Sequence, residues 1–267
     1  MINLAKIQFI LLIIVLLVLG GLSIKINNIG TQIINIEKEV GSINSSLYLE
    51  SENHFVEIMK KIDESVVVVV GFPASDNQDE KAVIYIDAAG NKGNLGAGFA
   101  VGDGEYILTA GHVVNGADNG GIILSNGTYI SAKFVDVYPA LDIAILYIGK
   151  KLIPSIEPEP QNIDIGSSVA FIGFPLGYDK RIVSQGIISS RAQTVYDEKW
   201  PTQTPIYIIN SAVNRGNSGG PVFSLKSGKV VGIINQVIEG TQGLGISTEI
   251  NEGMVKYMIS KLKERMK

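Results

Sequence analysis

From residue 66 onward, the chain alternates short runs of valine and isoleucine with clusters of glycine, asparagine, aspartate and proline. Short apolar runs bounded by turn formers are typical of β-strands, and their density here leaves no room for helices between them. Glycine makes up 30 of the 267 residues, and 46% of the chain is hydrophobic, as many strands and turns require. The sequence therefore predicts an all-β barrel or sandwich. The qualifying runs are Val66–Gly71, Val83–Asp87, Ala97–Val101, Tyr106–Thr109, Gly121–Leu124, Ala144–Tyr147, Val169–Gly173, Ile206–Ile209, Val230–Ile234 and Gly245–Ser247.

One glycine-rich turn in this region carries a serine, in the sequence Gly216-Asn217-Ser218-Gly219-Gly220-Pro221-Val222. A serine hydroxyl attacks a carbonyl group when a base removes its proton and nearby donors receive the new oxyanion. Glycines on both sides let the backbone approach a substrate closely and aim its N–H groups at one point. Taken alone, the turn is explained equally well as a tight connection between strands.

A base for Ser218 can be sought among few residues, because the chain has only two histidines, His54 and His112. His112 follows an apolar run at the point where a strand passes into a turn. The third member of a serine triad is a buried carboxylate that orients the imidazole. Asp142 suits this role because it enters an otherwise apolar run, where a charge is costly unless it is paired. Asp136 is the alternative, but its neighbours on one side are polar or of exposed type.

These segments together resemble the trypsin-like serine proteases and, among them, the bacterial HtrA/Deg branch. The order His, Asp, Ser is the same, and the spacings are compact: 142 − 112 = 30 and 218 − 142 = 76 residues. The resemblance extends from Ser65 to Ile250. The segments that carry it, besides the serine turn, are Thr109-Ala110-Gly111-His112, Asp142-Ile143-Ala144-Ile145-Leu146, Gly96-Ala97-Gly98-Phe99, Ile172-Gly173-Phe174-Pro175-Leu176-Gly177 and Val183-Ser184-Gln185-Gly186-Ile187-Ile188-Ser189.

The resemblance implies two six-stranded antiparallel β-barrels with the active site in the crevice between them. Within a protease domain of residues 63–250, the first barrel would span residues 65–150 and the second residues 161–250. Three prolines mark the segment that crosses between the barrels, Pro154, Pro158 and Pro160. A helix from Asn251 to Lys267 would follow. Members of the family usually continue into PDZ domains, and we expect none after this helix.

The resemblance also implies a role for each site residue. His112 would take the proton of Ser218 and later give it to the leaving amine, while Asp142 orients the imidazole. The backbone N–H groups of Gly216 and Ser218 match the family's oxyanion hole, which in HtrA-like enzymes is unformed at rest.

The primary specificity pocket is assigned in the same way. In the family its floor residue lies six positions before the nucleophile, which places Ala212 there, and Ile234 and Asn235 would form the opposite wall. Ala212 supplies no carboxylate to bind a basic side chain, and no third histidine is present to bind a glutamate. We therefore expect cleavage after small or medium aliphatic residues.

The function implied is that of a serine endopeptidase acting on unfolded or damaged proteins. Two alternatives stay open: a regulatory protease that cuts one partner, and a non-catalytic binding module on a protease scaffold.

We expect no cofactor and no metal, because the chain has no cysteine and its two histidines are far apart. The glycine cluster at 96–98 continues as a strand, unlike a dinucleotide-binding turn. A pI near 5.3 without a basic run argues against nucleic acid as a partner.

The N-terminal region predicts a membrane anchor. Residues 9–22 have no polar side chain, and an anchor over residues 7–25 approaches the roughly 20 apolar residues that span a bilayer. Lys6 and Lys25 flank it and can reach the membrane surface. We expect an uncleaved single-pass helix rather than a cleaved signal peptide, with residues 1–6 in the cytoplasm and the protease domain outside it, periplasmic or extracellular.

After the anchor, apolar residues recur in alternating steps of three and four, at Ile26, Ile29, Ile33, Ile36, Val40, Ile43 and Leu47. This spacing is typical of a coiled-coil seam, and isoleucine at both seam positions favours three or four strands. HtrA-type proteases are typically built on trimers, so we expect residues 26–62 to form the stalk and linker of a homotrimer. The alternative is an amphipathic helix lying on the membrane or on the protein's own barrel, because Gly30 and Gly41 weaken helix propensity.

Overall fold

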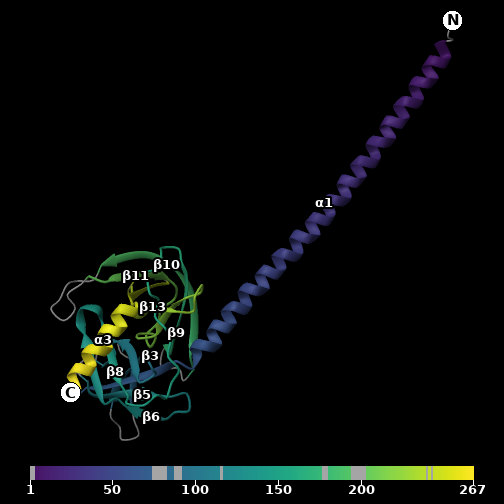
Figure 1. Ribbon diagram of the computed structural model, residues 1–267. Coiled ribbons are helices and arrows are strands. Elements are labelled where there is room, and N and C mark those ends of the chain that lie inside the picture. Colours follow the sequence, from purple (N-terminus) through teal and green to yellow (C-terminus); the bar gives the residue numbers. More distant parts are fainter. Residues whose placement is uncertain are drawn as a thin grey trace. The chain divides into compact units, whose positions relative to one another are not determined.

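The structure is a computed structural model of the protein (Figure 1). It describes residues 4–73, 83–86, 92–114, 117–175, 180–193, 203–238, 240–241 and 243–267. The chain divides into two compact units, Met1–Glu57 and Ile58–Lys267. Asp87 of one predicted strand, Leu176 and Gly177 of one family segment, and residues 1–3 of the predicted cytoplasmic end lie outside the described residues.

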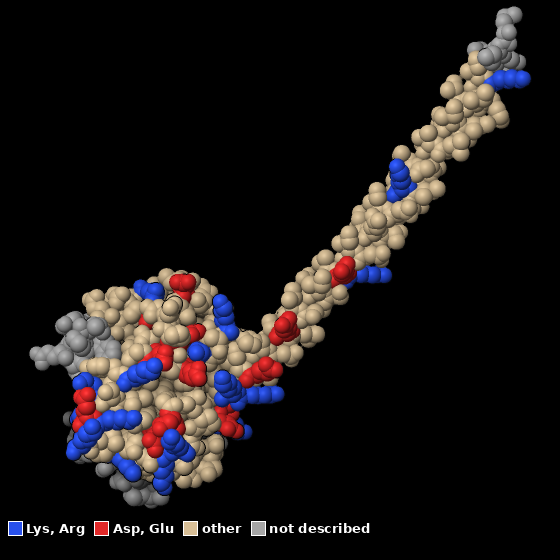
Figure 2. All heavy atoms as spheres, in the orientation of Figure 1, with Lys and Arg blue, Asp and Glu red and all other residues tan. Residues whose placement is uncertain are grey.

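A single helix, α1 (Leu4–Asp63), contains both the predicted anchor and the predicted stalk in 60 residues. It continues without a break through Gly30 and Gly41. A glycine in a helix costs only about 1 kcal/mol relative to alanine, and no proline, which would cost more, occurs in this segment. In the part of the chain that the structure describes, α1 is the one helix long and apolar enough to cross a membrane. Figure 2 shows its long stretch without charged side chains.

The first half of the unit Ile58–Lys267 is an eight-stranded antiparallel sheet. Its order is β6-β5-β1-β3-β4-β8-β7, with β2 paired to β3. Strands that a tight turn joins, such as β3 and β4, can pair only in this antiparallel way, because parallel pairs need long crossover connections. The strands are β1 (Val66–Pro73), β2 (Val83–Ile86), β3 (Lys92–Val101), β4 (Tyr106–Ala110), β5 (Ala117–Ile123), β6 (Tyr129–Ser131), β7 (Phe134–Tyr138) and β8 (Ile143–Tyr147).

This sheet is not the closed six-stranded barrel that the family resemblance implied. Among the described residues, β6 and β7 are not paired with each other, because the chain runs from one into the other through two residues. The Ala132 N–H donates to the Gly120 carbonyl at 2.8 Å, and the next N–H, of Lys133, donates to the Tyr147 carbonyl at 2.8 Å. The chain changes partner from β5 to β8 at this point. The strands β6 and β7 therefore follow each other along the chain and bind opposite ends of the strand order, without a ladder between them.

The second half is a closed barrel of six strands in the order β10-β11-β14-β13-β12-β9, as the resemblance implied for residues 161–250. The apolar runs did not predict β10, where serine, glutamine and glycine interrupt the isoleucines, or β12, which has only four residues. The strands are β9 (Ser168–Gly173), β10 (Ile182–Gln193), β11 (Pro205–Asn210), β12 (Pro221–Ser224), β13 (Val230–Val237) and β14 (Leu244–Glu249).

Each half has its own apolar core, filled mainly by β-branched and aromatic side chains. Each large side chain that is fully buried stabilises the fold by about 1.5–3 kcal/mol. The first core includes Val69, Ile107, Ile122 and Leu146, and the second includes Phe171, Tyr207, Val222 and Ile234.

The proline-containing segment between β8 and β9 ties the two halves together. Ile156 donates its N–H to the Ala100 carbonyl of the first sheet at 2.9 Å. Three residues on, Glu159 donates to the Val230 carbonyl of the barrel at 2.7 Å, and Val230 donates back to Glu157 at 2.9 Å. Because this short segment bonds to both sheets, it holds the two faces that carry the site residues in a fixed relation.

The C-terminal helix α3 (Glu252–Arg265) begins at Asn251, whose side chain accepts the Met254 N–H at 3.0 Å and so caps the helix. One face of α3 is buried and contacts β8 (Figure 1). Its last residue, Arg265, bonds through Nη1 to the carboxylate of Asp136, a side chain only 2% exposed.

Candidate active site

His112 and Asp142 are brought together by the pairing of two strands in the first sheet. His112 lies in the one-turn helix α2 (Gly111–Val114), which follows β4 directly. Asp142 follows the short 3-10 helix η1 (Pro139–Leu141) and comes just before β8. The strands β4 and β8 pair with Ala110 opposite Ile143. The residues just beyond that pair are therefore neighbours, although they are 30 positions apart in sequence.

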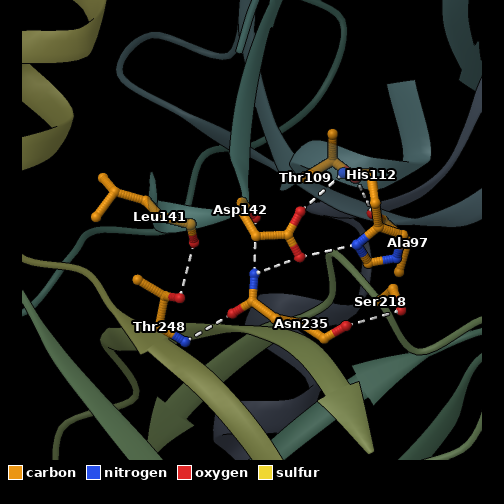
Figure 3. Close-up of polar contacts among 8 residues, drawn as sticks. All are labelled: Ala97, Thr109, His112, Leu141, Asp142, Ser218, Asn235 and Thr248. Atoms are coloured by element: carbon orange, nitrogen blue, oxygen red, sulfur yellow. Dashed lines mark hydrogen bonds and ion pairs between the residues drawn. The ribbon is translucent and has the colours of Figure 1, made fainter. Parts of the chain in front are cut away.

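Both carboxylate oxygens of Asp142 bind His112. Nδ1 of the imidazole lies 2.8 Å from Oδ2, and the His112 backbone N–H donates to Oδ1 at 2.8 Å (Figure 3). Since Nδ1 faces an acceptor, it carries the proton of the neutral ring, which makes Nε2 the proton acceptor. The geometry therefore sets the tautomer that a general base needs.

Asp142 is held in an unusual backbone conformation. Its φ of 49° is the only positive φ among the non-glycine residues that the structure describes. Left-handed backbone at a non-glycine residue costs on the order of 1–3 kcal/mol and concentrates at functional sites. Its N–H donates to the Pro139 carbonyl at 3.1 Å, and its carbonyl accepts the Gly111 N–H at 2.9 Å. These two bonds fix the carboxylate under the imidazole.

Ser218 lies in a turn of the barrel that packs against the first sheet. The two residues that follow it, Gly219 and Gly220, have no room for a side chain. A Cβ on Gly219 would lie 2.0 Å from the Ala97 carbonyl oxygen, and one on Gly220 would lie 2.1 Å from the Ile172 carbonyl oxygen. The Ser218 carbonyl accepts the Ala97 N–H at 2.7 Å. The glycines of the motif thus let a barrel turn pack against β3, and Figure 3 shows the Ser218 side chain beside the imidazole of His112.

Asn235, near the end of β13, connects Ser218 to Asp142. Its backbone carbonyl accepts the Ser218 Oγ–H at 3.3 Å, and its side-chain Nδ2 donates to the Asp142 carbonyl at 2.7 Å. Its Oδ1 accepts the Thr248 N–H at 2.7 Å. The hydroxyl of Thr248 in turn donates to the Leu141 carbonyl at 2.9 Å. The barrel therefore contacts Asp142 through the side chain of Asn235, and the residue before Asp142 through Thr248.

The residues assigned to the specificity pocket lie in three different environments. Ala212 is exposed, beside the buried Val213. The Ile234 side chain is fully buried in the barrel core, while its backbone accepts from Gly219 at 2.7 Å. Asn235 is 4% exposed and directed at Asp142. The side chains of Ile234 and Asn235 are thus engaged away from any pocket wall, and only their backbone could line one.

Gly216, the other assigned oxyanion donor, has φ 93°, a conformation that favours glycine. Its carbonyl accepts the Phe174 N–H at 3.2 Å.

The rejected acid, Asp136, is the more deeply buried of the two aspartates, contrary to the sequence argument against it. Its side chain is 2% exposed, compared with 25% for Asp142. It faces α3, where Arg265 binds it.

His54, the other histidine, lies in α1. Nothing in the local sequence around Asn235 or Arg265 indicated these pairings. Among the described residues, no group of three potential metal ligands comes together.

Comparison with known proteins identifies the family. Residues 96–233, slightly more than half of the chain, match the family described as the trypsin-like peptidase domain. The chain belongs to the trypsin-like peptidase family. The predicted resemblance is confirmed, and similar curated proteins place this trypsin-like peptidase near the HtrA type.

Two such relatives are named "Probable periplasmic serine endoprotease DegP-like". The protein of Pseudomonas putida is 36% identical over 159 residues, which cover 59% of this chain and 32% of that protein. The protein of Pseudomonas fulva is 33% identical over 172 residues, which cover 64% and 35% of the two chains. This chain therefore spans about a third of the length of these relatives.

Solved structures share the fold. The active form of the Rv3671c protease from M. tuberculosis has a TM-score of 0.61 at 21% identity, covering 77% of this chain and 83% of that one. An HtrA-type protease, AlgW, with a tripeptide has a TM-score of 0.61 at 23% identity and covers 80% and 64%. The serine endoprotease from Yersinia pestis has a TM-score of 0.58 at 24% identity and covers 78% and 66%.

Proposed function

We propose that this trypsin-like peptidase is a membrane-anchored serine endopeptidase that hydrolyses peptide bonds in unfolded or damaged proteins. The proposal rests on one observation, the contact of Asp142 with His112 beside Ser218 (Figure 3). This arrangement supplies a base of the required tautomer, an acid that orients it, and a hydroxyl.

In the proposed reaction, His112 Nε2 takes the proton of Ser218 as its Oγ attacks the scissile carbonyl. The N–H groups of Gly216 and Ser218 stabilise the oxyanion. The imidazolium then protonates the leaving amine, which leaves an acyl group on Ser218. A water molecule, deprotonated by the same imidazole, attacks this ester and releases the acid product.

The cellular arrangement is proposed from helix α1 and from the relatives. Residues 7–25 would anchor the chain, and the relatives named periplasmic support a protease unit outside the cytoplasm. All seven residues of the stripe from Ile26 to Leu47 expose 49% or more of their surface in the single chain. Large apolar side chains on one face are costly in water. Two further copies of the helix would cover that face and form a homotrimer.

The test is hydrolysis of a denatured, fluorescently labelled protein by the detergent-solubilised full chain, compared with its Ser218→Ala and His112→Ala variants. We expect turnover by the unaltered chain and none above background by either variant, with unchanged circular dichroism. Cleavage that persists in Ser218→Ala would overturn the mechanism. Binding without any cleavage would indicate a non-catalytic module, and cleavage of a single native protein but no denatured one would indicate a regulatory protease.

A further inference from the structure

The last turn of α1 is bound to the protease unit through one arginine. Nη1 of Arg181 lies 3.0 Å from the Asp63 Oδ2 and also donates to the Asp63 backbone carbonyl. The Arg181 side chain is only 19% exposed and that of Asp63 is 51% exposed, so the pair is shielded from solvent on the arginine side only. An arginine at a helix C-terminus also binds carbonyls that the helix leaves unpaired.

Apolar contacts reinforce this attachment. Ile62 is 1% exposed and Ile58 is 7% exposed, and the two lie on the same face of successive helical turns. A Cβ on Gly228 of the barrel would lie 3.4 Å from Ile58. The end of α1 is therefore a packed part of the unit Ile58–Lys267.

Arg181 comes just before β10, and Phe174 comes just after β9. The strands β9 and β10 are antiparallel, with Gly173 opposite Ile182 as their last pair. Continuing this register by one residue on each strand places Phe174 and Arg181 at the same end. The position of the start of β10, next to Arg181, therefore constrains the position of the end of β9, next to Phe174.

The other side of this strand end contacts the turn that carries Ser218. The Phe174 N–H donates to the Gly216 carbonyl at 3.2 Å. A Cβ on Gly173 would lie only 2.7 Å from the Asn217 Cα, so the two backbones are in direct contact. Asn217 is 2% exposed, and its Oδ1 has no hydrogen-bond partner among the described residues. Packing against β9 therefore holds Asn217, together with the backbone bond from its N–H to the Asn214 carbonyl at 3.0 Å.

We propose that Arg181 is a positioning residue for the reaction. By binding the end of α1, it keeps the end of β9 pressed against Gly216 and Asn217, and so keeps the serine turn in its reactive shape. Gly216 is the point at which the turn can change, because glycine at positive φ permits its peptide units to rotate. A change in how the end of α1 binds Arg181 would then change the shape of the active site. This inference rests on the proposed function.

The test uses the detergent-solubilised full chain and its Arg181→Gln variant. We expect kcat to fall about 10- to 100-fold, as for other small misplacements of reacting groups, while KM changes little. Labelling of Ser218 by a fluorophosphonate probe should slow in parallel, and the unfolding temperature should stay unchanged. The matched control is Lys180→Gln, which removes the same charge from the neighbouring, exposed residue and should leave kcat unchanged.

A second variant, Asp63→Asn, weakens the same contact from the helix side while the Asp63 carbonyl stays in place. It should lower kcat by less than Arg181→Gln does, and it decides the question if Arg181→Gln does not fold. Unchanged kcat in a folded Arg181→Gln variant, or in Asp63→Asn in its place, overturns the inference and leaves the proposed function intact. An unaltered chain that neither hydrolyses substrate nor reacts with the probe overturns both.

Discussion

The side-chain amide of Asn235 donates to the carbonyl of Asp142 at 2.7 Å and to its Oδ2 at 3.3 Å. Oδ2 is the same oxygen that faces Nδ1 of His112. The carboxylate therefore has three donors, two from His112 of its own sheet and one from the barrel. Since an ionised carboxylate that loses a donor must turn to find another, Asn235 should keep Asp142 aligned with the imidazole.

Replacing Asn235 by alanine should lower kcat by about 10- to 100-fold. A hydrogen bond to a charged group contributes about 1.5–3 kcal/mol, and each 1.36 kcal/mol changes a rate tenfold. Asn235→Asp should lower kcat further at neutral pH, because a second carboxylate beside Asp142 repels it. Steady-state hydrolysis of the labelled denatured protein measures both, with Asn126→Ala on an exposed turn as the control. Wild-type rates in both Asn235 variants would contradict this role.

Basal hydrolysis should be slow and should rise cooperatively with substrate concentration. The Arg215–Gly216 peptide can take two orientations, because Gly216 tolerates its φ of 93°. Only one orientation aims the Gly216 N–H at an oxyanion, and loss of one such donor costs about 2.7–4 kcal/mol of transition-state stabilisation. Initial rates over a range of substrate concentrations decide the matter. A hyperbolic curve without a lag on a short peptide would count against a switch at this peptide.

The stalk should dissociate when its seam becomes charged. Placing aspartate at both Ile33 and Ile36 puts two negative charges on the seam of each helix. In a homotrimer the same residues of the three helices face one another, so these charges repel. The mass of the detergent-solubilised chain, measured by light scattering, should fall from that of a trimer to that of a monomer. The matched control is Ile34→Asp with Leu49→Asp, two equally exposed apolar residues outside the stripe, which should leave the mass unchanged. An unchanged mass in the seam variant would remove the coiled coil.

Cleavage should follow small and medium aliphatic residues, mainly valine, alanine, isoleucine and leucine. Ala212 is exposed and carries no charge, and apolar pockets discriminate by only about 1–3 kcal/mol per methylene. Mass spectrometry of the fragments of a denatured protein maps the cut sites. Ala212→Asp should shift the cuts toward lysine and arginine. If the unaltered chain already cuts mostly after lysine, arginine or glutamate, the pocket has been assigned to the wrong residues.

Replacing Tyr207 by phenylalanine should destabilise the barrel by about 1–3 kcal/mol, because it removes a donor from a buried carboxylate. The Tyr207 hydroxyl donates to Glu249 Oε2 at 2.9 Å, and Glu249 is 2% exposed. Burial raises the pKa of Tyr207 well above its ordinary value, and the charge of Glu249 raises it further. Denaturant unfolding at neutral pH measures the loss, with Tyr147→Phe as the control.

The same variant has a distinct pH dependence. Above a pH of about 10, the tyrosine of the unfolded chain loses its proton while the folded one keeps it. The unfolded state then binds fewer protons, so stability falls as pH rises. The stability difference between the unaltered chain and Tyr207→Phe should therefore shrink above this pH. A difference that stays constant to higher pH would show that Tyr207 is not shielded in this way.

Most strands of the protease unit could be predicted because strongly apolar runs between turn formers have few other conformations. The strands that were missed, β6, β7, β10 and β12, are short or interrupted by polar residues. Their pairing partners, rather than their own side chains, place them in a sheet. The places of β6 and β7 in the first sheet have the same origin, because the chain changes its hydrogen-bond partner from β5 to β8 at Ala132 and Lys133.

The sequence by itself determined the parts of this protein whose chemistry or periodicity is local: the glycine-flanked Ser218, the single histidine after an apolar strand, the apolar N-terminal segment and the strand-rich unit. Only the tertiary structure decided the partners of Asp142, Asp136 and Asp63. Asn235, Arg265 and Arg181 lie 93, 129 and 118 positions from them in sequence. Such contacts depend on strand register and on how two sheets pack, and no local pattern encodes either. A buried charge requires a partner, but the fold alone chooses which residue it is.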